Sequence, residues 1–481
     1  MTAFDRRDET DGLPLPRRRT AYIALALATS MAVIDGSIAN TALPTIARDL
    51  QASPAASIWI VNGFQLAVAM SLFSLASLGQ LRGASRTYGA GVALFVVGSL
   101  GCALSRSLLW LVLCRVLQGL GAAGIMAIAP ALLRSIFPRR ELGRALGLNA
   151  VVIATSAAAG PTLGGILLAV APWPWLFAIN VPLGIANLAL NRTLPQDAPR
   201  PGRFDVPSAV ASALGFALVV WGLDGFARGE SGASIAARTL TGTIAIGWFA
   251  RRQFRLERPM IDLDLFAYAP FSFAAATSFA AFVAQGLAFV ALPFYFQETL
   301  HHTPFDSGLL LTSWPLTIAC VAPLAGRLSD RYPAGLLATA GLALLTLALA
   351  AYGFAGNTPS TTAIVLHGAA CGIGFGFFQA PNNRELIGSA PRAKTLSAAA
   401  VLAAVRIGGQ TTGASIVAIL FGVLGAAAVH GRGADAGAMA LAAPLALRIA
   451  AAFAGVATIA SGSRLWWVRS DSVMPSERAV S

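Results

Sequence analysis

The sequence predicts an all-α integral membrane protein built from two six-helix bundles with two helices inserted between them. Of its 481 residues, 56% are hydrophobic and 11% are charged, whereas soluble domains carry about 25% charged residues. Apolar runs of roughly 17 to 25 residues, each able to cross a bilayer, follow one another from Thr20 to Trp467. A water-soluble globular protein is therefore excluded.

The apolar runs, separated by short polar breaks, predict about fourteen membrane spans. In chain order they cover 20–44, 57–78, 89–105, 108–132, 146–170, 175–194, 207–226, 234–250, 272–296, 307–326, 334–354, 361–380, 397–427 and 445–467. No gap between them can hold a soluble domain of about 50 residues. We therefore expect no ATP-hydrolysing module in this chain.

The basic residues predict how the spans are oriented. The chain carries 34 Lys and Arg residues against 21 Asp and Glu residues, a net charge of +13. Twenty-six basic residues fall in alternate segments on one side and five on the other, the bias that marks cytoplasmic loops. Both termini are therefore expected in the cytoplasm, and the charge needs no nucleic acid partner. A single lysine, Lys394, among many arginines in an Ala- and Gly-rich chain indicates a GC-rich bacterial coding sequence. We therefore expect a multi-pass protein of the bacterial inner membrane.

A short internal repeat predicts how the spans divide. The turns at Gly79–Arg86 and Gly326–Arg331 are both basic and contain glycine, and they lie eight spans apart. Two six-helix halves would separate them by six spans, so two helices are expected between the halves. The expected organisation is a cytoplasmic tail at 1–19, a six-helix bundle at 20–205, two linker helices at 206–250, a second bundle with its preceding cytoplasmic loop at 251–467, and a cytoplasmic tail at 468–481.

Four motifs in chain order resemble those of a known transporter family. The run DGSIANTALP at Asp35–Pro44 is similar to the first-helix pattern L-D-x-T-x-x-N-V-A-L-P, and Leu111–Ala123 is similar to the fourth-helix motif L-x-x-x-R-x-x-Q-G-x-G. The run GPTLGG at Gly160–Gly165 is similar to the fifth-helix motif G-P-x-x-G-G, and 175–184 keeps the usual sixth-helix order of Trp, Phe, Asn, Pro and Gly. From about Ala32 to Gly413 the chain thus resembles the major facilitator superfamily, in its fourteen-helix drug:proton antiporter branch. The resemblance implies two bundles that rock about a midplane site and are coupled to proton movement.

Two charged side chains inside predicted spans are the candidates for proton coupling. Asp35 lies well inside the first span, where a carboxylate costs about 2.5 to 3.5 kcal/mol on insertion scales. It is a candidate proton carrier; alternatively, it lies near the outer interface and caps a helix break. Arg115, in the middle of the fourth span, cannot deprotonate. It either pairs with Asp35 or serves as a fixed hydrogen-bond hub.

Gly160, Pro161, Gly164 and Gly165 form a candidate flexing segment in the fifth span. Pro161 removes a backbone donor, and the glycines allow a neighbouring helix to come close. This segment is therefore expected either to bend between transport states or to pack tightly.

The cytoplasmic turns supply candidate gate residues. The family's loop motif G-x-L-x-D-R-x-G-R-R survives in part at Gln80, Gly83 and Arg86. Gln80 stands where the motif has its aspartate. This departure weakens the expected latch between a carboxylate and a helix in the first half. Asp330 and Arg331 occupy the corresponding turn of the second half. The alternative for Asp330 and Arg331 is a solvated, positively charged loop.

Other polar side chains inside the spans are candidates for a substrate cavity. Each of them either lines the cavity or makes a hydrogen bond between helices. The set is Gln65, Gln118, Gln285, His367, Gln379, Arg406 and Gln410. His367 is also a candidate second proton site, because histidine titrates near neutral pH.

Together these features predict a proton-coupled secondary transporter, not an enzyme, that exports amphipathic organic compounds or drugs by alternating access. The expected partners are a small-molecule substrate, protons and the lipid bilayer, without an ATPase subunit, a cofactor or a metal. The alternative is an importer, a symporter or a specific exporter of a small metabolite, including an anionic one. The H-x-x-x-x-D spacing at His301–Asp306 matches some membrane acyltransferases, but no second catalytic cluster accompanies it.

Overall fold

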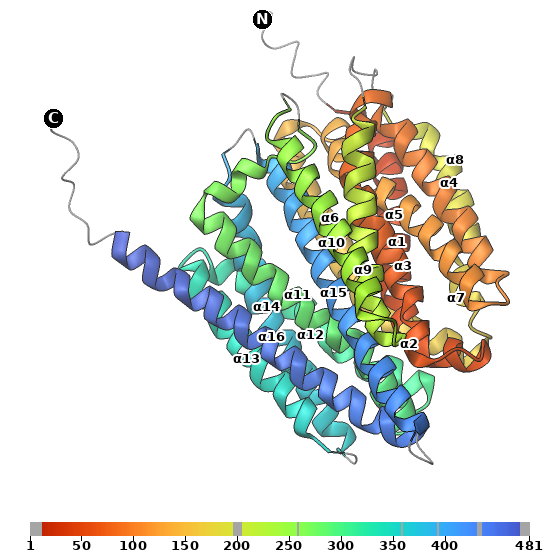
Figure 1. The fold of residues 1–481 in the computed structure, drawn as a ribbon. Helices are drawn as coiled ribbons and strands as arrows, with labels where there is room; N and C mark the ends of the chain where they lie inside the picture. The colour runs from red at the N-terminus through yellow and green to blue at the C-terminus, as the bar shows by residue number, and fades with distance from the viewer. Residues whose placement is uncertain are drawn as a thin grey trace, which may run out of the picture. The chain divides into compact units, whose positions relative to one another are not determined.

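The computed structural model describes residues 12–195, 204–256, 259–356, 359–391, 394–430 and 435–471 (Figure 1). In these ranges every regular element is a helix. The α-helices are α1 (Leu15–Asp49), α2 (Pro54–Ser57), α3 (Trp59–Arg82), α4 (Ala84–Ala103), α5 (Leu108–Ile136), α6 (Leu142–Val170), α7 (Trp175–Ala178), α8 (Asn180–Leu190), α9 (Val206–Ala227), α10 (Gly232–Gln253), α11 (Ala269–Phe294), α12 (Pro304–Leu328), α13 (Ala334–Phe354), α14 (Thr361–Gly388), α15 (Thr395–His430) and α16 (Asp435–Asp471). The outer parts of the two predicted tails, 1–11 and 472–481, lie outside the described residues.

Ile58 joins α2 to α3, and Ile179 joins α7 to α8; both residues are in helical conformation. The described α-helices therefore form fourteen continuous helical segments. Twelve of these helical segments are long and apolar enough to cross a membrane. The other two correspond to the predicted spans 175–194 and 234–250. The joined α7–α8 segment is short, since α7 has 4 residues and α8 has 11, and α10 has 22 residues but ends in arginines. The predicted fold class, an all-α membrane protein with about fourteen helices, is confirmed.

Polar caps determine where five of the helices begin. The side chains of Ser53, Ser107, Asp205, Ser231 and Ser360 each accept a hydrogen bond from the backbone N–H three residues further on. Such a cap satisfies one of the N–H groups that the first turn of a helix leaves unpaired. These caps lie in the polar breaks between the apolar runs, so local chemistry sets these helix starts.

The chain packs as two compact units that alternate along the sequence. Unit 1 comprises Met1–Ile261, Phe289–Thr312 and Ala414–Ala443, and unit 2 comprises Asp262–Ala288, Ser313–Gly413 and Pro444–Ser481. The bundle boundaries that the sequence predicts at 205 and 250 stay a prediction.

Unit 1 is organised around α5. This helix packs against both α3 and α4, while α1 packs against α6 and α9 pairs with α10 in a hairpin (Figure 1). Buried positions on α5 recur every three or four residues, at Leu111, Arg115, Gln118, Ala122 and Ile125. One face of a helix repeats with this spacing. The helix therefore carries a positive charge and an amide into the interior of unit 1 along with its apolar side chains.

Unit 2 contains a close pairing of α13 with α14 and an aromatic cluster beside it. The ring of Phe282, on α11, makes edge contacts with Phe375 and Phe378 of α14 at centroid distances of 5.5 and 6.5 Å. A Cβ at Gly409 of α15 would lie 2.8 Å from the carbonyl oxygen of Phe279. The absence of a side chain there lets α15 lie directly on α11.

Candidate functional site

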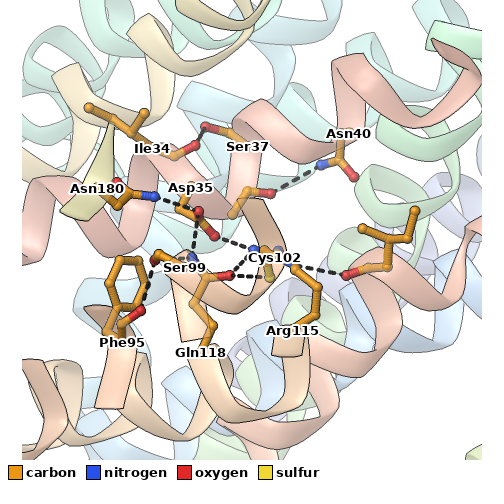
Figure 2. A network of polar contacts seen from close by, with 12 residues as sticks. Ile34, Asp35, Ser37, Asn40, Phe95, Ser99, Cys102, Arg115, Gln118 and Asn180 are labelled. Carbon is orange, nitrogen blue, oxygen red and sulfur yellow. Dashed lines mark hydrogen bonds and ion pairs between the residues drawn. The ribbon is translucent and has the colours of Figure 1, made fainter. Parts of the chain in front are cut away.

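A buried polar network surrounds Asp35 in unit 1 (Figure 2). Asp35 lies on the buried face of α1, and only 1% of it is exposed. Its Oδ2 accepts a hydrogen bond from Nη1 of Arg115, and the two side chains form an ion pair. Its Oδ1 accepts hydrogen bonds from Nε2 of Gln118 at 2.8 Å and Nδ2 of Asn180 at 2.9 Å. Asp35 is thus held by side chains from α5 and α8.

Arg115 is fully buried and has partners on several sides. Its Nε donates to the backbone oxygen of Ile60 at 3.0 Å, and its Nη1 donates to Oε1 of Gln118 at 2.6 Å as well as to Asp35. The guanidinium lies 4.3 Å from the ring centroid of Phe64 and 5.5 Å from that of Phe177. Because guanidinium stays protonated, this arrangement places a permanent positive charge beside the Asp35 carboxylate.

The network combines predicted and unpredicted residues. The pairing of Asp35 with Arg115 and the nearness of Gln118 agree with one of the sequence-based alternatives, although the roles of these residues stay predictions. Sequence reasoning did not select Asn180 or Ser99 as site residues; Ser99 Oγ accepts a hydrogen bond from Nε2 of Gln118 at 2.8 Å. The signal that could have found both is a small polar residue inside an apolar run, which needs a hydrogen-bond partner when buried.

The candidate flexing segment lies where α6 contacts α1. Gly160, Pro161, Gly164 and Gly165 are all buried. A Cβ at Gly160 would overlap the Ser37 hydroxyl, so α1 and α6 approach closely at this point. Pro161 lies inside the helix without ending it. The structure shows the close approach, and bending between states stays a prediction.

The candidate gate residues fall into two separate groups, one in each unit. Gly83 joins α3 to α4 with φ +99°, a backbone conformation that favours glycine. Gln80 and Arg86 are exposed on either side of it. In unit 2, Asp330 forms an ion pair with Arg384, while Arg331 is exposed.

The candidate cavity residues are also divided between the units. In unit 1, Gln65 is half-buried, and Gln118 belongs to the Asp35 network. In unit 2, Nε2 of Gln410 donates to Oε1 of Gln285 at 2.9 Å, and the guanidinium of Arg406 lies 5.7 Å from the ring centroid of Phe282.

The last two candidate cavity residues, His367 and Gln379, lie on α14 in unit 2. The His367 ring contacts that of Tyr352 at a centroid distance of 5.1 Å, and Gln379 is half-buried. Neither is part of the Gln285–Gln410 hydrogen bond.

Unit 1 contains further polar contacts that the sequence did not predict. Nδ2 of Asn62 donates to Oγ of Ser415 at 3.2 Å, and Nε2 of Gln297 donates to the backbone oxygen of Thr41 at 3.0 Å. The Asn62 and Gln297 side chains are both buried. They connect α1 and α3 to the parts of the later helices that belong to unit 1.

Ion pairs also close the ends of the α9–α10 hairpin. Nη2 of Arg252 donates to Oδ1 of Asp205 at 3.0 Å, and Ser208 donates to the same carboxylate. Burial raises the pKa of Asp205, but the hydrogen bonds from Arg252 and Ser208 outweigh it, and the pKa lies below its usual value. At the other end, hydrogen bonding to Arg238 lowers the pKa of Glu230. Both carboxylates are therefore held in their ionised form.

Comparison with known sequences supports a transporter. The Major Facilitator Superfamily profile matches residues 25–414 and 274–473. The chain is 44% identical to the Uncharacterized transporter YebQ of Escherichia coli K12 over 465 residues, covering 96% of this chain and 99% of that protein. It is 30% identical to the Riboflavin transporter RibZ of Clostridioides difficile, with 80% of this chain and 84% of that protein covered. It is also 30% identical to the Multidrug resistance protein Stp of Mycobacterium tuberculosis, with 82% and 74% covered.

A solved structure shares the fold. A bacterial homolog of the human lysosomal transporter Spinster, in an inward-facing and unoccupied conformation, superposes with a TM-score of 0.68 at 17% identity. The likeness covers 94% of this chain and 98% of that one. The profile match, the three relatives and the all-helical fold lead to one conclusion: the chain belongs to the Major Facilitator Superfamily and is a membrane transporter, not an enzyme.

Proposed function

We propose that this transporter exports amphipathic organic compounds in exchange for protons, by alternating access, as a member of the fourteen-helix drug:proton antiporter branch. The observation that carries the proposal is the fully buried Asp35–Arg115 ion pair with its hydrogen-bonded neighbours. A relative that bears the name of a multidrug resistance protein supports the substrate class. The proposed location is the bacterial inner membrane with both termini in the cytoplasm, and no ATPase subunit is required.

The energetics of the ion pair suit a coupling device. Binding a proton to Asp35 removes the negative partner of a buried arginine, and losing one partner of a buried pair costs about 3–5 kcal/mol. Shifting a two-state equilibrium from 1:99 to 99:1 takes about 5.5 kcal/mol. One protonation at this site therefore supplies an energy close to what a change of conformation needs. The membrane potential adds about 2.3 kcal/mol per charge per 100 mV.

The remaining predicted residues have roles in the same proposal. Gly160, Pro161, Gly164 and Gly165 form the segment where α6 bends against α1. The cytoplasmic gate consists of Gln80, Gly83 and Arg86 in unit 1 and of Asp330 and Arg331 in unit 2. Among these gate residues only Asp330 forms an ion pair within the described part of the chain, and its partner is Arg384.

The test uses inverted membrane vesicles loaded with a pH-sensitive dye and energised to acidify their interior. A panel of lipophilic compounds is added to vesicles with wild type, Asp35→Asn and the control Asp224→Asn. Asp224 is a suitable control because it is also a buried acid with an arginine partner, Arg228, at 3.2 Å. We expect compounds to trigger proton release with wild type and Asp224→Asn but not with Asp35→Asn. Uphill transport by correctly inserted Asp35→Asn would exclude the proton-carrying role.

A second candidate function is transport of one small metabolite, by import, symport or specific export. It is favoured by the relative named as a riboflavin transporter, which matches 80% of this chain. The same panel separates the two functions. A response to chemically diverse compounds supports drug export, whereas a response confined to one metabolite supports the narrow transporter.

A further inference from the structure

Three arginines of the described residues lie in the interior of membrane-spanning helices, and they differ in what their guanidinium groups contact. Arg115 has a carboxylate, an amide oxygen and a backbone oxygen. In Arg448, Nε donates to the backbone oxygen of Gly353 at 2.8 Å, and the guanidinium lies 4.5 Å from the centroid of Phe354. Arg406 contacts the ring of Phe282, and no oxygen of the described residues accepts a hydrogen bond from it. Arg406 is thus a permanent charge without a counter-ion among the residues that the structure describes.

The position of Arg406 makes this lack of a partner chemically significant. It lies nine residues inside the span Ser397–Gly425, about 14 Å along the helix at 1.5 Å per residue. The side chain is half-buried and cannot release its proton. A ring face attracts a cation but accepts none of its five N–H donors in a strong hydrogen bond. Charged residues at this depth pair with one another or face a substrate path.

None of the described carboxylates of unit 2 forms an ion pair with Arg406, because each has another partner. Asp330, in the turn after α12, pairs with Arg384, and Glu385, near the end of α14, pairs with Arg464. Before α11, Asp264 pairs with Lys394, and Asp262 accepts a hydrogen bond from Ser397. The negative group that would complete the Arg406 site must therefore come from outside this set of residues.

Two amides next to Arg406 extend the same polar site. Gln410 lies one turn further along α15, and Gln285 lies one turn beyond Phe282 on α11. Gln410 donates to Oε1 of Gln285 at 2.9 Å, which leaves the NH2 group of Gln285 without an acceptor among the described residues. Because α11 and α15 pack closely at Gly409, the guanidinium and this amide donor belong to one helix–helix contact.

We infer that Arg406, together with the NH2 group of Gln285, binds the anionic group of an amphipathic organic substrate, such as a carboxylate, sulfonate or phosphate. The planar guanidinium presents parallel N–H donors that fit such groups in a bidentate manner. Phe282 positions the guanidinium, and Gln410 orients the Gln285 amide. This inference rests on the proposed export function and narrows its substrate class to organic anions.

The test compares two probes that differ in one sulfonate: 8-anilinonaphthalene-1-sulfonate and the neutral N-phenyl-1-naphthylamine. Both are offered to proteoliposomes with an imposed pH gradient, and uptake above that of empty liposomes is measured after rapid filtration. The variants are Arg406→Gln, Arg406→Lys and the control Arg448→Gln, which removes an intramembrane charge that already has a backbone partner in unit 2.

We expect Arg406→Gln to lower transport of the sulfonate at least about tenfold, the effect of losing a hydrogen bond to a charged group, while transport of the neutral probe is unchanged. Arg406→Lys should keep part of the sulfonate transport, since lysine keeps the charge but lacks the planar fork. Arg448→Gln should change both probes by the same factor. An equal loss of both probes in Arg406→Gln would show a structural role and overturn the inference.

Two further outcomes separate this inference from the proposed function. If wild type exchanges the neutral probe for protons but does not move the sulfonate, the anion site is refuted and proton-coupled export stands. If wild type moves neither probe, the melting temperature of the protein in nanodiscs is measured with each one. A shift by the sulfonate that Arg406→Gln abolishes supports the site, and the absence of such a shift overturns it.

Discussion

Arg115 in unit 1 and Arg406 in unit 2 are both arginines within apolar helices, yet the groups around their guanidinium groups differ. Arg115 is fully buried, with Asp35, Gln118 and a backbone oxygen around it. Arg406 is half-buried against an aromatic ring and has no acidic partner in the described residues. The difference teaches that the charge of Arg115 is balanced by a carboxylate of the same unit, whereas the charge of Arg406 has no such partner among the described residues. The proposed coupling role of Arg115 and the proposed anion site at Arg406 rest on this contrast.

The largest effect is expected when the internal balance of unit 1 is broken. Arg115→Ala leaves Asp35 buried without a cation, and we expect a loss of about 3–5 kcal/mol in the free energy of unfolding. The measurement is the fraction of purified protein that keeps its size-exclusion peak after heating, compared between the variant and wild type. The double variant Asp35→Asn with Arg115→Gln should be more stable than Arg115→Ala, because no charge is then left unpaired. Wild-type stability of Arg115→Ala would contradict the ion-pair account.

A second prediction compares helix packing in the two units. Gly160→Ala puts a methyl group into the space of Ser37, and we expect a destabilisation of about 1–3 kcal/mol, as for other overpacked interiors. The matched change Gly408→Ala in unit 2, where the nearest atom is a ring carbon of Phe279 at 3.9 Å from the new methyl, should stay within about 0.5 kcal/mol. Melting temperatures of both variants provide the measurement. Restored stability in Gly160→Ala with Ser37→Gly would show that the Ser37 contact is the cause.

The third prediction concerns stability at the unbalanced charge. Arg406→Gln removes no described hydrogen bond, so we expect the free energy of unfolding to fall by no more than about 1 kcal/mol. The same heating assay used for Arg115→Ala measures it. A loss as large as that of Arg115→Ala would mean that Arg406 has an internal partner in the folded protein, and the contrast between the units would disappear.

The smallest effect is expected from an ion pair outside the spans. The lowered pKa of Asp205 means that its contribution to stability is present above the unfolded-state pKa and is lost as pH falls through the folded-state pKa. For a partly exposed pair this contribution is about 1 kcal/mol or less. Melting temperatures of wild type and Asp205→Asn across acidic pH should therefore converge as pH decreases. A difference that grows toward low pH would contradict the assigned sign.

Much of the fold could be predicted because it depends on local properties. The apolar runs and the polar caps such as Ser107 and Ser360 mark the helices one by one. The predicted spans 175–194 and 234–250 are helical, but neither is among the twelve helices long and apolar enough to cross a membrane. In these segments α8 is short, and α10 carries charges at its end. Length and charge within a segment decide whether it can span a bilayer, and both lie close to the limit there.

The site could be predicted only in part. Asp35 and Arg115 stand out in the sequence because an ionised group in an apolar run is rare and costly. Asn180, by contrast, belongs to a sixth-helix motif, but nothing in the sequence links it to Asp35, and its bond to Asp35 joins residues 145 positions apart. Asp330 was predicted at a gate, but its pairing with Arg384 on another helix was not.

The sequence by itself determined that this protein is a helical membrane transporter with two separate arginines of interest, since hydrophobic length, charge bias and motif order are written along the chain. The tertiary structure alone decided that Arg115 has a carboxylate partner and that Arg406 has none among the described residues. The reason is geometric. A hydrogen bond forms only where the faces of two helices meet, and which faces meet depends on the packing of the whole unit.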